Sequence, residues 1–198
     1  MAIEAITQMN EENTAPVEVA GYALRDVLIK AALVVPDDND GIETLFTFYP
    51  SIHMDATGPS WWDFHVSSCS QGGHWNSHMT GTIGINARPR HILRQVPPMN
   101  RKATGKAWNE ALRSVGFDYG PSFQDMDDVR SDGERFHAVA SSVVKTESGM
   151  VQGESRYVLH PATIDSCLQL IIVSIYAGKM EDMTCGAVPT QVSEVLIW

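Results

Sequence analysis

The sequence predicts a fold of the α+β class, because strand patterns joined by short turns accompany one long apolar helix. Residues 22–36 and 42–49 are rich in β-forming side chains and flank the polar turn 37–41, an arrangement typical of paired strands. Residues 162–176 contain no helix breaker. Their apolar side chains recur at spacings of three and four, which predicts one core-facing stripe: Ile164, Leu168, Ile171, Ile172 and Ile175.

The first half of the chain is expected to open with a short helix and to continue as strands. Residues 1–8 place Ile3 and Ile6 on one side of a helix. No capping residue precedes this helix, which predicts that the true beginning of the protein lies upstream. Residues 61–69 alternate enough to form a strand, and 75–85 form another after a glycine-rich turn.

A stretch without periodicity follows. Residues 88–104 include two consecutive prolines and are interpreted as a linker. A short amphipathic helix is predicted over 108–115, ended by Gly116 in the manner of a C′ glycine. Further strands are expected over 135–145, around 156–159, and from 188 to the end of the chain.

Composition and charge exclude several classes of protein. The 198 residues suffice for one sizeable domain or two small ones, with 43% hydrophobic and 19% charged residues, as in soluble globular proteins. The net charge of −10 argues against a nucleic-acid partner. No apolar run could span a membrane and no signal peptide is evident, so we expect action in the cytoplasm. The three cysteines are widely separated, which indicates neither a disulfide framework nor a metal site.

The candidate chemistry centres on the start of the long helix. Pro161 suits a first helical turn, where its missing N–H costs nothing. Asp165 and Gln169 are four residues apart and share a face close to the apolar stripe. Partial desolvation there would raise the pKa of the Asp165 carboxyl, and Gln169 could fix its rotamer. An aspartate in a first turn commonly does no more than favour the helix dipole, so spacing alone leaves both interpretations open.

A second motif precedes this one. Residues 118–123 read Asp-Tyr-Gly-Pro-Ser-Phe, and residues 160–169 read His-Pro-Ala-Thr-Ile-Asp-Ser-Cys-Leu-Gln. The two motifs in this order resemble the second half of the dehydratase domain of polyketide synthases. The sequence of the second motif is most similar to that of the fungal, highly reducing, iterative enzymes. The resemblance covers essentially the whole chain, whereas the chain does not cover the whole dehydratase domain.

The resemblance implies a double hotdog, in which two antiparallel sheets are each wrapped around a central helix, truncated here at both ends. Residues 1–87 would be the C-terminal part of the first hotdog subdomain, with residues 1–8 as the end of its helix. Residues 88–104 would be the linker. Residues 105–198 would be the second hotdog subdomain, lacking its last strands.

The resemblance also implies an activity and roles for individual residues. The reaction would eliminate water from a carrier-bound 3-hydroxyacyl thioester to give a 2,3-enoyl thioester in secondary-metabolite biosynthesis. Asp165 matches the proton donor, Gln169 the residue that orients it, and Tyr119 a residue that orients the substrate or the acid. Simple aromatic packing of Tyr119 is the open alternative. The resemblance further assigns five residues to the substrate channel: Gly120, Pro121, Phe123, His160 and Pro161.

The base of this reaction has no match in the chain. In the family it is a histidine of a His-x-x-x-Gly-x-x-x-x-Pro motif, and none of the seven histidines has glycine four positions later. We therefore expect the base upstream of Met1, and expect the isolated chain to be inactive or a poor enzyme. One alternative is a catalytically dead remnant or scaffolding fragment. Another, less favoured, is a cyclase of the product-template type.

The resemblance implies partners but no cofactor. The substrate would arrive on the phosphopantetheine arm of an acyl carrier protein, and the other domains of the synthase, a multifunctional transferase, would be further partners. No metal is expected. Homodimerisation, substrate chain length, methyl branching and product geometry stay open at this point.

Overall fold

The computed structural model describes residues 1–36, 41–52, 61–70, 72–85, 98–147 and 157–197. They form two compact units. The first holds the described residues up to 85 together with those from Pro189 onward, and the second holds those from 98 to Val188. Among all of these residues, no helix combines the length and the apolar character needed to cross a membrane.

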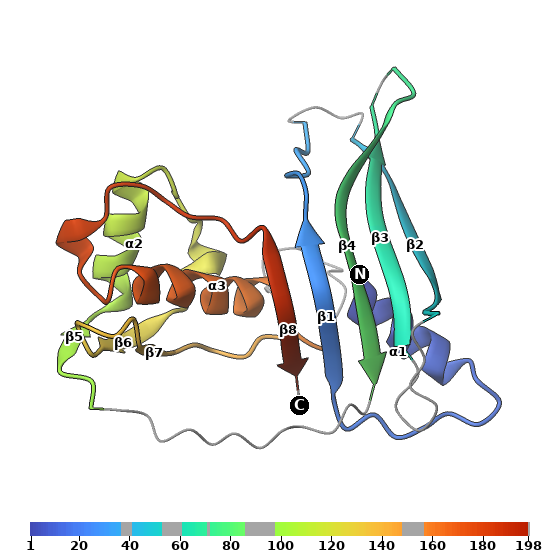
Figure 1. Ribbon diagram of the computed structural model, residues 1–198, viewed down its shortest axis with the longest axis horizontal. Helices are drawn as coiled ribbons and strands as arrows, with labels where there is room; N and C mark the ends of the chain where they lie inside the picture. The colour runs from blue at the N-terminus through green and yellow to red at the C-terminus, as the bar shows by residue number, and fades with distance from the viewer. Residues whose placement is uncertain (37–40, 53–60, 71, 86–97, 148–156, 198) are drawn as a thin grey trace. The chain divides into compact units, whose positions relative to one another are not determined.

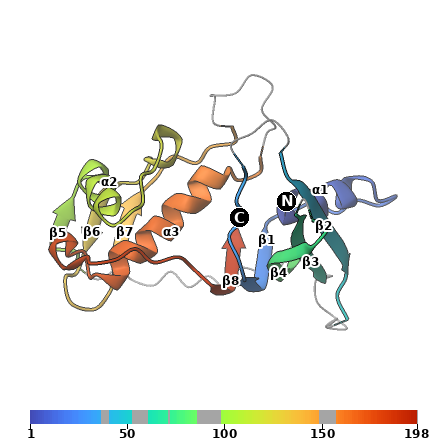
Figure 2. The ribbon, with the colours of Figure 1, turned by 90° about the horizontal axis from the view of Figure 1, so that it is seen from above.

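The first unit is a five-stranded antiparallel sheet covered on one face by helix α1 (Ala2–Glu11) (Figures 1 and 2). The strand order is β2-β3-β4-β1-β8. The strands are β1 (Tyr22–Ile29), β2 (Glu43–Pro50), β3 (Trp61–Cys69), β4 (Trp75–Ile85) and β8 (Gln191–Ile197). The predicted strands over 42–49, 61–69 and 75–85 are present, whereas β1 ends at Ile29, well before residue 36.

The core of this unit forms where α1 meets the sheet. Ile6 of α1 is fully buried against a layer that includes Phe64 and Ile83. Gly81 lies on β4 opposite Phe64 of β3. A Cβ at residue 81 would lie 2.7 Å from the Phe64 ring, so the bulky ring requires a glycine across from it.

Strand β8 belongs to this sheet. It pairs antiparallel with β1, from Tyr22 opposite Ile197 to Leu28 opposite Gln191. The sequence analysis grouped these last residues with the second subdomain, and the structure instead pairs them with the first unit. A strand pattern shows which side chains alternate but does not identify the neighbouring strand.

The second unit contains a three-stranded antiparallel sheet and two α-helices. The strands are β5 (Arg101–Ala103), β6 (Asp127–Ser131) and β7 (Ala138–Ser141), and the helices are α2 (Gly105–Ser114) and α3 (Pro161–Ile175). Two short 3-10 turns, η1 (Pro121–Phe123) and η2 (Met180–Asp182), complete it. Its core consists of Trp108, Leu112, Met126, Val129, Ile172, Val173 and Met183. β7 is shorter than the predicted strand 135–145, and residues 157–159 form no strand.

Helix α2 starts earlier than predicted because of its cap. The hydroxyl of Thr104 accepts a hydrogen bond from the Ala107 N–H at 3.2 Å. Gly105, the first helical residue, donates its N–H to Asp127 Oδ1 at 2.9 Å. The helix ends as predicted, since Gly116 has a φ of +100°.

Helix α3 has the predicted extent, but the predicted core face is wrong in part. Of the five stripe residues only Ile172 is buried, whereas Ile164, Ile171 and Ile175 are 38%, 50% and 48% exposed. The buried side of α3 consists mostly of smaller or polar residues: Ala162, Thr163, Ser166, Gln169, Ile172 and Val173. The spacing located an apolar stripe, whereas close packing of α3 against β7 and η1 selected a neighbouring face with smaller side chains.

Candidate functional site

The start of α3 is ordered by its own first residues. Pro161 occupies the first helical position, and His160 is the N-cap. The Nδ1 atom of buried His160 accepts a hydrogen bond from the Ala162 N–H at 3.1 Å. The Tyr157 ring meets the imidazole edge to face at 5.1 Å. His160 and Pro161 therefore fix where the helix begins.

Asp165 lies beyond the first turn of α3, whereas the sequence analysis treated it as a residue of that first turn. The helix begins at Pro161, and its first turn contains no acidic residue. The field of a helix terminus falls off within that turn, so the dipole interpretation loses its basis. Asp165 is half-buried, and this desolvation raises the pKa of its carboxyl.

Gln169 supplies the hydrogen bond that the spacing predicts. Its Nε2 donates to Asp165 Oδ2 at 2.7 Å. This bond favours the ionised carboxyl and partly offsets the effect of burial, which still raises the pKa of Asp165 overall. The environment of Asp165 thus combines partial burial with one fixed donor.

The amide orientation of Gln169 is set by a contact that the sequence did not suggest. Gln169 is fully buried, and Nε2 also donates to the backbone carbonyl of Phe123 at 2.8 Å. A carbonyl oxygen can only accept, so the amide nitrogen must face it. Both N–H bonds of the amide are then used. The Oε1 atom is buried and has no hydrogen-bond partner among the described residues.

Tyr119 lies close enough to Asp165 for the carboxylate charge to affect the pKa of its phenol. The Tyr119 ring stacks on Phe117 with centroids 5.9 Å apart and planes within 10°. Burial raises the pKa of the Tyr119 phenol, and the negative charge of Asp165 raises it further. Aromatic packing and proximity to the acid therefore occur together in this residue.

The loop from Tyr119 to Asp125 has its own internal support. Pro121 opens the 3-10 turn η1 after Gly120. The side-chain amide of Gln124 donates to the Tyr119 carbonyl at 2.6 Å and closes the loop on itself. Phe117, under Tyr119, packs so closely on Gly186 that a Cβ there would lie 1.8 Å from the ring. The motif residues thus form a supported loop beside α3.

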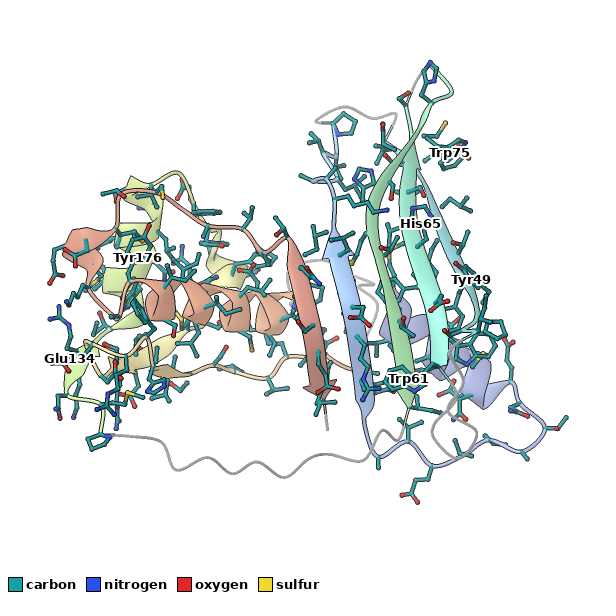
Figure 3. The ribbon with its side chains drawn as sticks, viewed as in Figure 1. Tyr49, Trp61, His65, Trp75, Glu134 and Tyr176 are labelled. Carbon is teal, nitrogen blue, oxygen red and sulfur yellow. The ribbon has the colours of Figure 1, made fainter. Side chains whose placement is uncertain are left out.

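Four of the described histidines have side-chain partners of their own: His65, His78, His137 and His160. In the first unit, buried His78 joins Ser68 Oγ at 2.8 Å and the Ala31 carbonyl at 3.2 Å, which ties the end of β1 to the β3–β4 hairpin. His65, on β3 in Figure 3, lies 2.8 Å from Ser77 Oγ. In the second unit, His137 Nδ1 lies 3.2 Å from Asp132 Oδ2. His53 and His91 lie outside the described residues.

The part of the chain that the structure describes contains no group of three or more metal-ligating side chains. The arrangement that remains is a half-buried carboxyl with a raised pKa, one fixed amide donor and a phenol nearby. Such a carboxyl can hold a proton closer to neutral pH than an ordinary aspartate. It can deliver that proton to a departing oxygen, which is general-acid chemistry.

Comparison with known proteins identifies a matching family model and relatives of this chain. Residues 87–198 match the family model described as the polyketide synthase dehydratase N-terminal domain. The chain is 50% identical over 200 residues to "Reducing polyketide synthase DEP5" of Alternaria brassicicola, and 29% identical over 199 residues to "Prosolanapyrone synthase" of Alternaria solani. These matches cover 100% and 98% of the chain but only 8% of each relative.

Solved structures agree on the fold. The dehydratase domain from the CurK module of the curacin polyketide synthase superimposes with a TM-score of 0.69 at 18% identity. The match covers 98% of this chain and 64% of that one. The dehydratase domain of RzxB from Pseudomonas fluorescens gives a TM-score of 0.68 at 16% identity. At this level of identity the likeness concerns the fold alone, and it confirms the predicted α+β class with hotdog architecture.

Proposed function

Because the chain belongs to the polyketide synthase dehydratase family, we propose that Asp165 is the proton donor in the removal of water from a 3-hydroxyacyl thioester. The observation that carries this proposal is the half-buried carboxyl of Asp165, whose raised pKa coincides with a hydrogen bond from Gln169 at 2.7 Å. An acid must be protonated at the working pH before it can act, and burial favours that form.

In the proposed reaction a base removes the proton at C2, and the electron pair of that C–H bond forms the C2–C3 double bond. The C3–O bond breaks, and the hydroxyl takes the proton of Asp165 and leaves as water. The Asp165 carboxylate that remains keeps the hydrogen bond from Gln169, which stabilises the negative charge as it develops. The reaction is neutral in redox terms and requires no electron carrier.

The neighbouring residues take supporting roles in this proposal. The Tyr119 phenol, whose pKa responds to Asp165, would contact the substrate hydroxyl or the acid. Gly120, Pro121 and Phe123 would form one wall of the substrate channel, and His160 with Pro161 another. Gln169 would orient the acid.

The base is proposed to be a histidine outside the second unit. Of the histidines described in that unit, His160 caps α3 and His137 pairs with Asp132. The substrate would be presented on the phosphopantetheine arm of an acyl carrier protein, in the cytoplasm, next to the other domains of a reducing synthase. The chain spans about 8% of the length of its curated relatives, and the partners are proposed on that basis.

The test supplies the base chemically, so that only the acid is in question. The chain is mixed with a 3-hydroxybutyryl thioester and imidazole, and the enoyl thioester is followed by mass. Asp165→Asn should lower imidazole-supported turnover by about 10²–10⁴-fold, the usual contribution of one proton transfer. The matched control is Asp182→Asn, which changes an exposed acid of η2 and should retain turnover.

Equal turnover in the two variants would overturn the assignment of Asp165. If the unmodified chain gives no imidazole-supported turnover, the proposed function fails and a non-catalytic role is favoured.

A further inference from the structure

Lys145 connects two segments that hold the candidate acid. Its backbone N–H donates to Thr163 Oγ1 at 3.1 Å, and its carbonyl accepts from the His160 N–H at 3.1 Å. The backbone of Lys145 is therefore attached to the start of α3 on both sides of Pro161. Thr163 Oγ1 also donates to the Val143 carbonyl at 3.2 Å, which strengthens the attachment.

The side chain of Lys145 reaches the loop that carries Tyr119. Its Nζ lies 2.5 Å from Asp125 Oδ2, and the two side chains are only 22% and 18% exposed. An ion pair that is largely removed from water is screened less than a surface pair. If one partner is removed, the other is left as a poorly solvated charge, which is much more costly than loss of a surface pair. Each of the other Lys and Arg ion pairs found in the described residues has side chains at least 43% exposed.

These contacts form a closed series that includes the candidate acid, Asp165. Asp125 follows Phe123 by two residues, and the Phe123 carbonyl accepts from Gln169 Nε2. Gln169 in turn donates to Asp165, in the helix whose start holds the backbone of Lys145. The position of the Phe123 carbonyl decides which end of the Gln169 amide faces Asp165, because an amide rotated by 180° would set oxygen against oxygen.

We propose that the Lys145–Asp125 ion pair is a positioning element of the candidate active site, which holds Phe123 against Gln169 and Tyr119 beside Asp165. Lys145 contacts neither the acid nor Gln169 in any described hydrogen bond, and it acts through the loop. The inference rests on the proposed function for its catalytic meaning. Its geometric content, the placement of Tyr119 and of the amide, can be measured without turnover.

The test compares Lys145→Met, which removes the charge, with Lys145→Arg, which retains it. Carbon-13 NMR of labelled tyrosine, with the signal assigned by Tyr119→Phe, reports the pKa of the Tyr119 phenol. Burial and the charge of Asp165 both raise this pKa, so a loosened loop should lower it toward the ordinary tyrosine value. Lys145→Arg should retain the raised value. Imidazole-supported turnover should fall by roughly 10²-fold in Lys145→Met, as expected for a misplacement of about 1 Å.

Two further variants guard against a trivial loss of folding. Asp125→Asn removes the other charge with little change in shape, and should shift the Tyr119 pKa in the same direction. Arg101→Met breaks the exposed Arg101–Glu181 ion pair, whose N–O distance is 2.9 Å, and should leave the pKa of the Tyr119 phenol unchanged. A Tyr119 pKa that stays raised in both Lys145→Met and Asp125→Asn would overturn the inference, even if thermal stability falls. Turnover retained in Asp165→Asn would contradict only the proposed function, so the two failures are distinguishable.

Discussion

Asp165 and Gln169 lie one turn apart on α3, and the Gln169 amide nitrogen donates to Asp165 Oδ2 at 2.7 Å. Two effects therefore act on the same carboxyl in opposite directions. Burial disfavours its charged form, and the amide donor favours that form, with burial the larger effect. Because Gln169 donates simultaneously to the Phe123 carbonyl at 2.8 Å, the donor cannot turn away from Asp165 without losing a second bond.

The raised pKa of Asp165 makes a prediction about stability and pH. The folded state binds the carboxyl proton more tightly than the unfolded state, so the associated penalty is absent below the unfolded pKa. The penalty grows as pH rises through the folded pKa and is complete above it. Asp165→Asn removes this titration. In urea unfolding, the stability of the variant relative to the parent chain should therefore be greater at pH 7 than at pH 3. A difference independent of pH would contradict the raised pKa.

Loss of the Gln169 donor should raise the pKa of Asp165 further. Gln169→Met has a similar volume but leaves Asp165 and the Phe123 carbonyl without their donor. A buried acceptor without its partner costs about 1–3 kcal/mol, which urea unfolding measures. Carbon-13 NMR of the Asp165 carboxyl should show the upward pKa shift. The control Leu168→Met introduces the same side chain at the preceding position and should leave the Asp165 pKa unchanged. An unshifted Asp165 in Gln169→Met would refute the role of the amide.

The sequence predicted the Asp165–Gln169 contact because a spacing of four places two side chains on one helical face. It could not predict the Phe123 carbonyl as the partner of Gln169, since a backbone acceptor carries no residue-type signal. The Lys145–Asp125 pair is likewise a contact between residues far apart in sequence, and its two charges are ordinary in composition. Only the folded arrangement brings them together.

The type of each element, helix or strand, was predicted more successfully than the strand with which it pairs or the face that it buries. The residues of β8 alternate as a strand does, but only the register with β1 reveals the sheet to which it belongs. In α3 the isoleucine spacing identified a stripe, whereas the buried face contains Ala162, Ser166 and Gln169. Small residues allow the helix to approach its neighbours closely, and a hydrophobicity pattern gives them little weight.

Two adjacent isoleucines test this assignment of faces. Ile172 is 4% exposed in the core with Trp108, whereas Ile171 is 50% exposed. Ile172→Ala should lower the free energy of unfolding by about 2–5 kcal/mol through lost burial and a cavity. Ile171→Ala should change it by no more than about 0.5 kcal/mol. Urea unfolding of the two variants provides the comparison, and equal losses would mean that the faces of α3 are assigned incorrectly.

Gly105, at the start of α2, provides the last prediction. A Cβ at this position would lie 1.7 Å from the Met126 carbonyl oxygen, and backbone cannot move aside as a flexible side chain can. The same glycine donates its N–H to Asp127 Oδ1, so a shift of α2 would also lengthen that bond. Gly105→Ala should therefore lower the free energy of unfolding by about 3 kcal/mol, at the upper end of overpacking effects.

Gly120→Ala is the matched control for this change. Its φ of −68° suits alanine, and a Cβ there meets nothing within 4 Å. The control should therefore leave the free energy of unfolding within about 0.5 kcal/mol of the parent chain, as for other surface changes. If Gly105→Ala unfolds at the same urea concentration as Gly120→Ala, α2 does not pack on Met126 as closely as the structure has it. In that case the Thr104 cap alone, and not steric contact with the Met126 carbonyl, determines where the helix begins.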